Sequence, residues 1–213
     1  MKLDLHIHSK FSYDSFSDPS KIVKVAERKG LDVISITDHG NMRVYEDFPR
    51  GHGSGVTIIP GMEIKTDVGD VTGLFLDEGI GSRSFFDVVD EIRDQDGIVV
   101  LPHPFRRKCD PNDLIGYVDL VEVINARSKN MENVDAWKLC ERFGKTPITG
   151  SDAHTYFEIG RAVTEIDGYS DDPDELKKIL LNAERNCYGK ETPFYISHGY
   201  SFISSRIKRC WKL

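Results

Sequence analysis

Short apolar runs alternate with amphipathic segments along this sequence, and that alternation limits the folds that the chain can adopt. Eight runs rich in Val and Ile are expected to be strands: Leu3–His8, Asp32–Thr37, Val56–Ile64, Val71–Leu76, Ile98–Leu101, Asp119–Ile124, Pro147–Thr149 and Ala162–Ile166. Several are apolar on both faces, as is typical of strands in a sheet covered by helices. The turn at 67–70 predicts that the third and fourth runs form a hairpin. The pattern predicts an α/β fold.

Helix signals occupy the segments between these runs. Asp18-Pro19 and Asp172-Pro173 each place an N-cap residue before a proline at the first helical position. Helices are also expected over 84–96 and 134–144, where apolar residues recur at helical spacing. We predict a small (β/α) barrel. A doubly wound open sheet is the alternative, but no strand is followed by the glycine-rich loop that such folds use for nucleotides.

The length of 213 residues favours one domain, 1–213, with a C-terminal helical segment at 171–213. No apolar run approaches the roughly 18 residues that span a membrane, and the N-terminus does not resemble a signal peptide. The four cysteines form no CxxC pair, which indicates thiols in a reducing compartment, and we expect a cytoplasmic protein. The glycine-rich stretch around His52 is expected to be a mobile loop, and the basic tail 206–213 to be solvated.

Imidazoles and carboxylates cluster where the apolar runs end. Asp4, His6 and His8 alternate with apolar residues, so their side chains share one strand face. Further polar residues end or follow four other runs: Asp38, His39, Glu63, His103, Asp152 and His154. In a (β/α) barrel those ends meet at one rim, where active sites lie. His, Asp and Glu without thiolates suit Zn²⁺, Mn²⁺ or Fe²⁺, and they exceed one tetrahedral set. The sequence therefore predicts a multinuclear metal site.

Six short motifs in a fixed order give the chain a family resemblance. They are Asp-Leu-His-Ile-His-Ser at 4–9, Thr-Asp-His at 37–39, Pro-Gly-Met-Glu-Ile at 60–64, His-Pro at 103–104, Glu-Val-Ile-Asn at 122–125 and Gly-Ser-Asp-Ala-His at 150–154. With this set the chain resembles the polymerase and histidinol phosphatase (PHP) family, in its short single-domain phosphoesterase form. The resemblance implies a distorted (β/α)7 barrel with a trinuclear centre at its rim, holding two to three Mn, Zn or Fe ions.

The resemblance also implies which residues hold the ions. It assigns His6, His8, Glu63 and Asp152 to the first ion, Glu63 (as a bridge) and His103 to the second, and Asp14, His39 and His154 to the third. Many trinuclear relatives supply another histidine between the positions of His103 and His154, where this sequence has none and Asn125 stands. The second ion is therefore expected to have few protein ligands.

Phosphate recognition requires cationic donors near the metals. Arg106, after the His-Pro motif, and Arg127, after Glu-Val-Ile-Asn, are expected at the rim, with Arg107 and Arg161 as further candidates. Asp38 is expected to orient a ligand imidazole.

Three functions remain open from the sequence. The leading hypothesis is a metal-dependent phosphoesterase that hydrolyses a small phosphomonoester, a nucleotide or a sugar phosphate, by metal-activated hydroxide. A nuclease acting on nucleic acid ends uses the same chemistry but requires a basic groove. The balance of 28 Lys+Arg against 35 Asp+Glu, net −7, disfavours it. The third is a non-catalytic metal-binding regulatory module. We expect a small phosphorylated substrate and no membrane partner; oligomeric state is left open.

Overall fold

Nine strands form one sheet in the computed structural model, which describes residues 1–47 and 55–211. The order across the sheet is β7-β6-β5-β4-β3-β2-β1-β8-β9. The strands are β1 Lys2–Ile7, β2 Val33–Ile36, β3 Thr57–Thr66, β4 Gly69–Leu74, β5 Ile98–Leu101, β6 Leu120–Asn125, β7 Thr146–Gly150, β8 Ala162–Ile166 and β9 Arg185–Gly189. β1, β2 and β3 run parallel, as do β5, β6 and β7. β4 pairs antiparallel with β3 and β5, so the expected hairpin is present.

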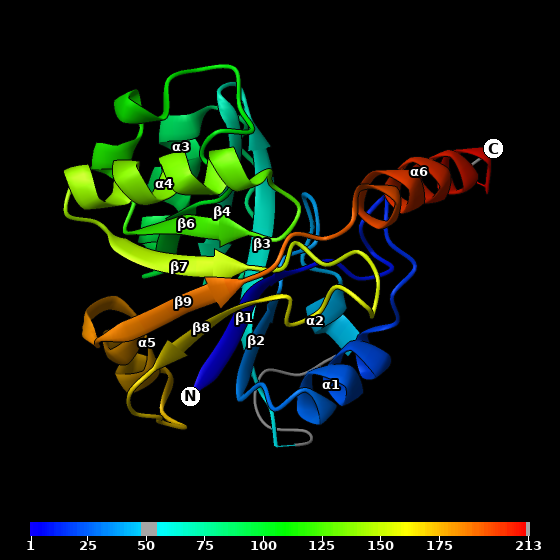
Figure 1. Ribbon diagram of the computed structural model, residues 1–213, viewed down its shortest axis with the longest axis horizontal. Helices are drawn as coiled ribbons and strands as arrows, with labels where there is room; N and C mark the ends of the chain where they lie inside the picture. Colours follow the sequence, from blue (N-terminus) through cyan, green and yellow to red (C-terminus); the bar gives the residue numbers. More distant parts are fainter. Residues whose placement is uncertain (48–54, 212–213) are drawn as a thin grey trace.

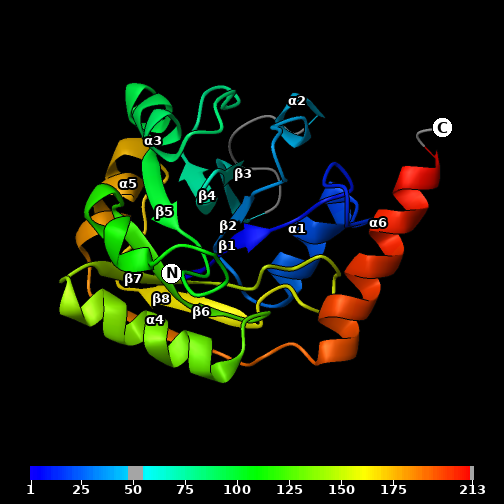
Figure 2. The ribbon, with the colours of Figure 1, turned by 90° about the horizontal axis from the view of Figure 1, so that it is seen from above.

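The sheet curls until its parallel halves meet (Figure 2). Just after β7, Ala153 forms a parallel bridge with Ile7 of β1. The Thr149 N–H of β7 donates to Thr164 Oγ1 of β8 at 2.9 Å. The predicted distorted (β/α)7 barrel is therefore confirmed. Its closure brings the carboxyl ends of β1 and β7 together, and the predicted site lies at those ends.

Helices cover the outside of this sheet (Figure 1). They are α1 Pro19–Arg28, α2 Val44–Asp47, α3 Phe85–Asp94, α4 Asn130–Arg142, α5 Pro173–Asn182 and α6 Tyr200–Trp211. Asp18 and Asp172 accept hydrogen bonds from the first backbone N–H groups of α1 and α5, as the Asp-Pro pairs predict. The apolar face of α3, with Phe85 and Ile92, packs in the core against β3, β4 and β5. Within the described residues, no helix is long and apolar enough to cross a membrane.

The C-terminal part differs from the helical segment expected at 171–213. It contains α5 and α6, but β9 lies between them and pairs antiparallel with β8. β9 is an edge strand with largely exposed side chains, so its sequence carries no apolar alternation. α6 then lies against the loop that follows β1 (Figures 1 and 2). The stretch around His52, expected to be a mobile loop, falls outside the described residues.

Candidate metal centre

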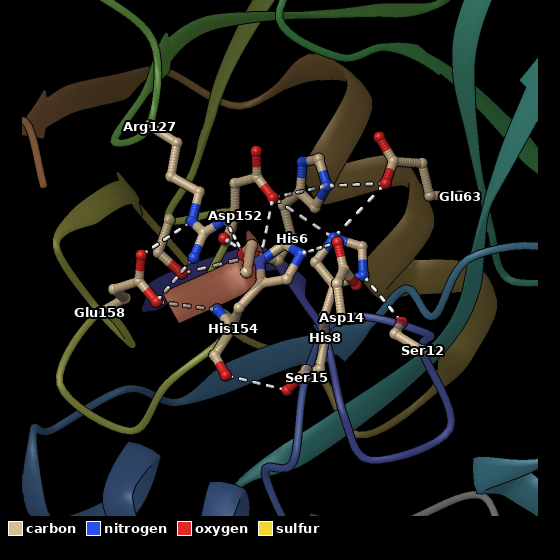
Figure 3. A network of polar contacts seen from close by, with 12 residues as sticks. His6, His8, Ser12, Asp14, Ser15, Glu63, Arg127, Asp152, His154 and Glu158 are labelled. Atoms are coloured by element: carbon tan, nitrogen blue, oxygen red, sulfur yellow. Dashed lines mark hydrogen bonds and ion pairs between the residues drawn. The ribbon is translucent and has the colours of Figure 1, made fainter. Parts of the chain in front are cut away.

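Glu63 belongs to a buried cluster of imidazoles and carboxylates (Figure 3) and contacts four of the imidazoles. Its Oε2 lies 3.0 Å from His39 Nδ1, 3.4 Å from His8 Nε2 and 3.5 Å from His6 Nε2. Its Oε1 lies 3.0 Å from His103 Nε2. One carboxylate from β3 thus faces four imidazoles. His6 lies in β1, His8 directly after it, His39 after β2 and His103 after β5.

Asp152 and Asp14 complete the cluster from two loops. Asp152 Oδ1 lies 3.3 Å from His8 Nε2 and 3.8 Å from His6 Nε2. Asp14 Oδ2 lies 3.0 Å from His154 Nε2 and 3.6 Å from His39 Nε2. The structure therefore brings together all eight side chains predicted as ligands.

Several ligand atoms in this cluster are buried without a hydrogen-bond partner. Within the described residues they include His6 Nε2, His8 Nε2, Asp14 Oδ1 and Glu63 Oε2. Burying such atoms unpaired is costly, so four of them around one centre indicate a missing partner. Two ligand atoms about 2.1 Å from one tetrahedral ion lie about 3.4 Å apart. The separations of His8 Nε2 from Asp152 Oδ1 and Glu63 Oε2, 3.3 and 3.4 Å, and of His6 Nε2 from Glu63 Oε2, 3.5 Å, match that geometry. The residues fit metal ions.

Three groups of side chains could each hold one ion. Each group has ligand atoms that lie within 4.8 Å of one another: His6, His8 and Asp152; His6, Glu63 and His103; and His8, His39 and His154. The first two resemble the expected first and second sets. In the third, His8 stands where the resemblance implies Asp14, although Asp14 does contact both His39 and His154.

Charges in the cluster favour ionised carboxylates and a neutral His8, whereas the same carboxylates, against burial, raise the pKa of His6 and of His39 well above the usual value. Burial tends to raise the pKa of Glu63, but His6 and His39 outweigh burial and hold it well below its usual value. The pKa of Asp152 is likewise held well below its usual value, against burial, chiefly by His6. Burial, with His154 and His39 beside it, lowers the pKa of His8 to about 3. His8 is therefore a neutral imidazole, the form that binds metals.

Two imidazoles are oriented by residues behind them. His6 Nδ1 is 2.9 Å from Oε1 of buried Glu122. His8 Nδ1 is 3.1 Å from Ser12 Oγ, and Ser12 Oγ donates to Asp38 at 2.7 Å. In both cases a proton held on Nδ1 leaves the Nε2 lone pair facing the cluster. Asp38 thus contacts the imidazole of His8, through Ser12, rather than the ring of its neighbour His39.

The predicted arginines differ in their surroundings. Arg106 Nη1 lies 2.7 Å from Asp152 Oδ2, and its side chain is 36% exposed. Arg127 is buried and forms a two-point ion pair with Glu158, at 2.7 and 3.2 Å, and donates to Ser201 Oγ (Figure 3). Both line a cavity of about 230 Å³ over the cluster.

The other two arginine candidates do not line this cavity among the described residues. Arg107 donates to backbone carbonyls of Asp70, Pro102 and Pro104, and Arg161 donates to the carbonyl of Glu191. Each therefore fixes the chain locally.

Asn125 fills the space between two acidic residues instead of facing His103. Its Nδ2 donates to Glu122 Oε2 at 2.9 Å and lies 3.4 Å from Asp152 Oδ2. Asn125 therefore positions these carboxylates. Glu122, Ser12 and Glu158 were not predicted from the sequence as site residues. Only Glu122 stood within a motif.

Comparisons with known proteins match the chain to a family model and to two relatives. A family model described as the PHP domain matches residues 4–188. The chain is 32% identical over 196 residues to the uncharacterized protein MJ0417 of Methanocaldococcus jannaschii, covering 85% of this chain and 78% of that protein. Over 141 residues it is 38% identical to MJ1587 of the same organism, covering 59% of this chain and 82% of that one.

Solved structures with the same fold include two of high similarity. A two-domain protein from Bacteroides vulgatus, described as containing a predicted PHP-like metal-dependent phosphoesterase, has a TM-score of 0.73 and 22% identity over 96% of this chain and 69% of its own. PsfC from Pseudomonas syringae has a TM-score of 0.70 and 21% identity over 99% of this chain and 98% of its own. At these identities the likeness shows the shared fold.

Proposed function

Because the chain belongs to the PHP domain family, we propose that it is a metal-dependent phosphoesterase that hydrolyses a small phosphomonoester, a nucleotide or a sugar phosphate. The observation that carries this proposal is the set of buried ligand atoms without partners, His6 Nε2, His8 Nε2, Asp14 Oδ1 and Glu63 Oε2, beneath an open cavity. A purely structural cluster would pair these atoms with one another or with neighbouring side chains. The description of the similar Bacteroides vulgatus protein as a phosphoesterase agrees with it.

The bound ions supply the charge that activates water and that stabilises negative oxygen atoms on a phosphoryl group. Eight residues would hold them: His6, His8, Asp14, His39, Glu63, His103, Asp152 and His154. We propose Mn, Zn or Fe, because imidazole and carboxylate ligands suit these metals.

Arg106 is the side chain best placed to bind the substrate phosphate. Its guanidinium lies beside Asp152, lines the cavity and is partly exposed. Its remaining N–H groups, which do not contact Asp152, can therefore donate to phosphate oxygens. Arg127 forms its ion pair with Glu158 instead. The backbone N–H of His154 also donates to Glu158, at 3.0 Å, so Arg127 and Glu158 together fix the cavity wall and the loop of His154.

The cavity favours a small reacting group. Its volume of about 230 Å³ lies below the roughly 300 to 1,000 Å³ of most small-molecule sites. It fits a phosphoryl group and the atoms next to it. The rest of the substrate would lie outside.

The test is phosphate release by the purified protein from p-nitrophenyl phosphate, nucleoside monophosphates and sugar phosphates, with and without chelator. Protein purified without chelator should hold more than one equivalent of Mn, Zn or Fe by elemental analysis, and activity should disappear when the metal is removed. Full activity in chelator, or a metal-loaded protein that releases no phosphate from any of these esters, would contradict the proposal.

Arg106→Ala separates substrate binding from metal binding. We expect KM to rise about tenfold or more, since a charge-assisted hydrogen bond is lost, with metal content unchanged. Arg142→Ala, an exposed arginine on α4, is the matched control and should change neither. Wild-type KM in Arg106→Ala would remove this residue from the phosphate site.

A further inference from the structure

A groove of about 850 Å³ lies beside the metal cavity. Its walls come from the loop after β1, the loop after β2 and α6, and they comprise Lys10, Phe11, Ser12, Tyr13, Phe16, His39, Asn41, Arg43, Ser205, Ile207, Lys208 and Arg209. Tyr13 and His39 line both the groove and the metal cavity. A ligand whose phosphate reaches the metal centre therefore has a continuous surface for its remaining atoms.

The groove is positively charged although the chain as a whole is acidic. Lys10, Arg43, Lys208 and Arg209 line it, and among its described lining residues there is no Asp or Glu, although Lys10 also forms an ion pair at 3.1 Å with Asp18, which is not a lining residue. Against a net charge of −7 for the chain, this local excess of cations indicates an anionic ligand.

Aromatic side chains stand between these cations. Tyr13 is 59% exposed and stacks on His39, with ring centroids 4.8 Å apart and planes at 23°. Phe16 is 45% exposed, and Lys208 Nζ lies 5.0 Å from the centre of its ring. The guanidinium of Arg43 lies 5.3 Å from the ring of Phe11. Exposed aromatic faces interleaved with cations form the kind of surface on which single-stranded nucleic acids stack.

The helix α6 holds one wall of the groove in place. Lys208 Nζ donates to the carbonyls of Lys10 and Ser12, at 2.6 and 2.5 Å, and Ser204 Oγ donates to the carbonyl of Asp14 at 2.6 Å. Lys208 is thus a structural contact of the β1 loop, not part of a solvated tail as the sequence suggests. Since α6 begins beyond residue 188, where the family match ends, the groove is built by a segment outside that match.

We propose that this groove binds the end of a short single-stranded nucleic acid whose terminal phosphate lies in the metal cavity. Tyr13 stacks on the first base, and the cations of the groove contact the phosphates that follow. The proposal rests on the proposed function for its reaction: water adds across the terminal P–O ester bond, which releases inorganic phosphate and leaves a hydroxyl on the oligonucleotide. The groove accordingly selects the leaving group, and the metal cavity accepts the phosphoryl group.

Binding is tested first without turnover, in chelator, by fluorescence anisotropy of 5′-phosphorylated hexathymidylate that carries fluorescein at its 3′ end. The double variant Arg43→Ala/Arg209→Ala should bind about tenfold more weakly. The slope of log affinity against log salt should fall by about 1.4, as expected for two lost phosphate contacts on a single strand. Lys21→Ala/Lys24→Ala, two exposed cations of α1 outside the groove, is the matched control and should retain wild-type affinity and slope.

A second pair of variants tests stacking. Tyr13→Ala should weaken hexathymidylate binding about tenfold, whereas Tyr13→Phe, which keeps the ring, should bind as the wild type does. Wild-type binding by the double variant, or by Tyr13→Ala, would overturn the proposal, as would equal losses in the α1 control.

Turnover distinguishes failure of this proposal from failure of the proposed function. In Arg43→Ala/Arg209→Ala, kcat/KM for 5′-phosphorylated hexathymidylate should fall about tenfold, while kcat/KM for p-nitrophenyl phosphate stays unchanged. The proposal is wrong if kcat/KM for thymidine monophosphate equals that for the hexamer and the double variant changes neither value. The groove would then not bind the strand. If no ester is hydrolysed, the proposed function fails, and the anisotropy result still decides whether the groove binds nucleic acid.

Discussion

Replacing Glu122 with Gln tests how the protein directs the His6 imidazole toward the metal ions. Glu122 Oε1 is 2.9 Å from His6 Nδ1, whereas Oε2 accepts from the His103 backbone N–H at 2.8 Å and from Asn125 Nδ2 at 2.9 Å. The NH₂ group of Gln cannot accept a hydrogen bond, so it is expected on the His6 side, where it faces one donor rather than two. There it donates to His6 Nδ1. The ring proton then resides on Nε2, the atom that faces Glu63 and Asp152.

A protonated Nε2 cannot ligate, so Glu122→Gln removes one ligand from two of the three groups. Loss of such an orienting carboxylate typically lowers metal affinity about 10- to 100-fold, or about 1.4 to 2.8 kcal/mol. The free energy of unfolding of the metal-free protein should change by only about 1 kcal/mol, because every hydrogen bond at this position is replaced.

Metal affinity is measured by competition with a chelating indicator. The protonated nitrogen of His6 is measured by NMR of the histidine rings in metal-free protein, at a pH high enough to make His6 neutral, because Glu122, Glu63 and Asp152 outweigh burial and raise the pKa of His6. Glu165→Gln, an exposed glutamate on β8, serves as the matched control and should behave as the wild type. If Glu122→Gln binds metal with wild-type affinity while His6 carries its proton on Nε2, the reasoning is refuted. The same holds if the proton stays on Nδ1 and affinity still falls.

Three further outcomes are expected. Glu63→Gln should lose at least one equivalent of metal and about 100-fold in turnover, since Glu63 contacts four imidazoles. Elemental analysis and kinetics of the purified variant test this. Normal metal content with normal turnover would contradict it. Gly150→Ala should destabilise the protein by several kcal/mol in thermal unfolding, because its Cβ would lie 2.0 Å from Glu122 Oε1. Gly116→Ala is the control, since a Cβ there would have nothing within 4 Å. Equal unfolding midpoints for the two variants would refute this. In thiol titration at pH 8, exposed Cys210 should react rapidly and Cys140 only on unfolding, because burial raises the pKa of Cys140 to about 12; rapid reaction of Cys140 in the folded protein would contradict that burial.

The fold was predictable where strands are buried on both faces. β2 and β5 are wholly buried, so their sequences are near-continuous apolar runs that mark them as central strands, whereas β1 alternates apolar residues with Asp4 and His6. β9 was missed because an exposed edge strand needs no such pattern. The last residues of α6, from position 206, were expected to be a solvated tail, because contacts such as that of Lys208 with the carbonyl of Lys10 join residues far apart in sequence.

Most of the candidate ligands were predictable because they lie on, end or follow an apolar run, and barrel closure brings those run ends together; Asp14, in the loop after β1, was assigned by the family resemblance alone. The residues that orient the ligands were not predictable. Ser12 supports His8 only because its loop folds back over the ring, and Glu158 reaches Arg127 across the cavity wall. Such partners carry no spacing signal, since their pairing depends on tertiary structure. Asp38 was identified by its position next to His39, yet its actual role depends on Ser12.

Net charge led the sequence argument away from nucleic acid, but the net charge of a chain is a weak guide to the field at one site. Net charge sums over the whole surface, whereas a ligand responds to the local field in the cleft that it enters. Here the acidic side chains include the buried ligands Glu63 and Asp152, which would offset the charge of metal ions and so contribute little to repulsion of a substrate. The cations of the groove, by contrast, remain at the surface beside Tyr13 and Phe16. A chain of net charge −7 can therefore present a positive path to the cavity over its candidate ligands, which is the local charge that the proposed nucleic-acid ligand requires.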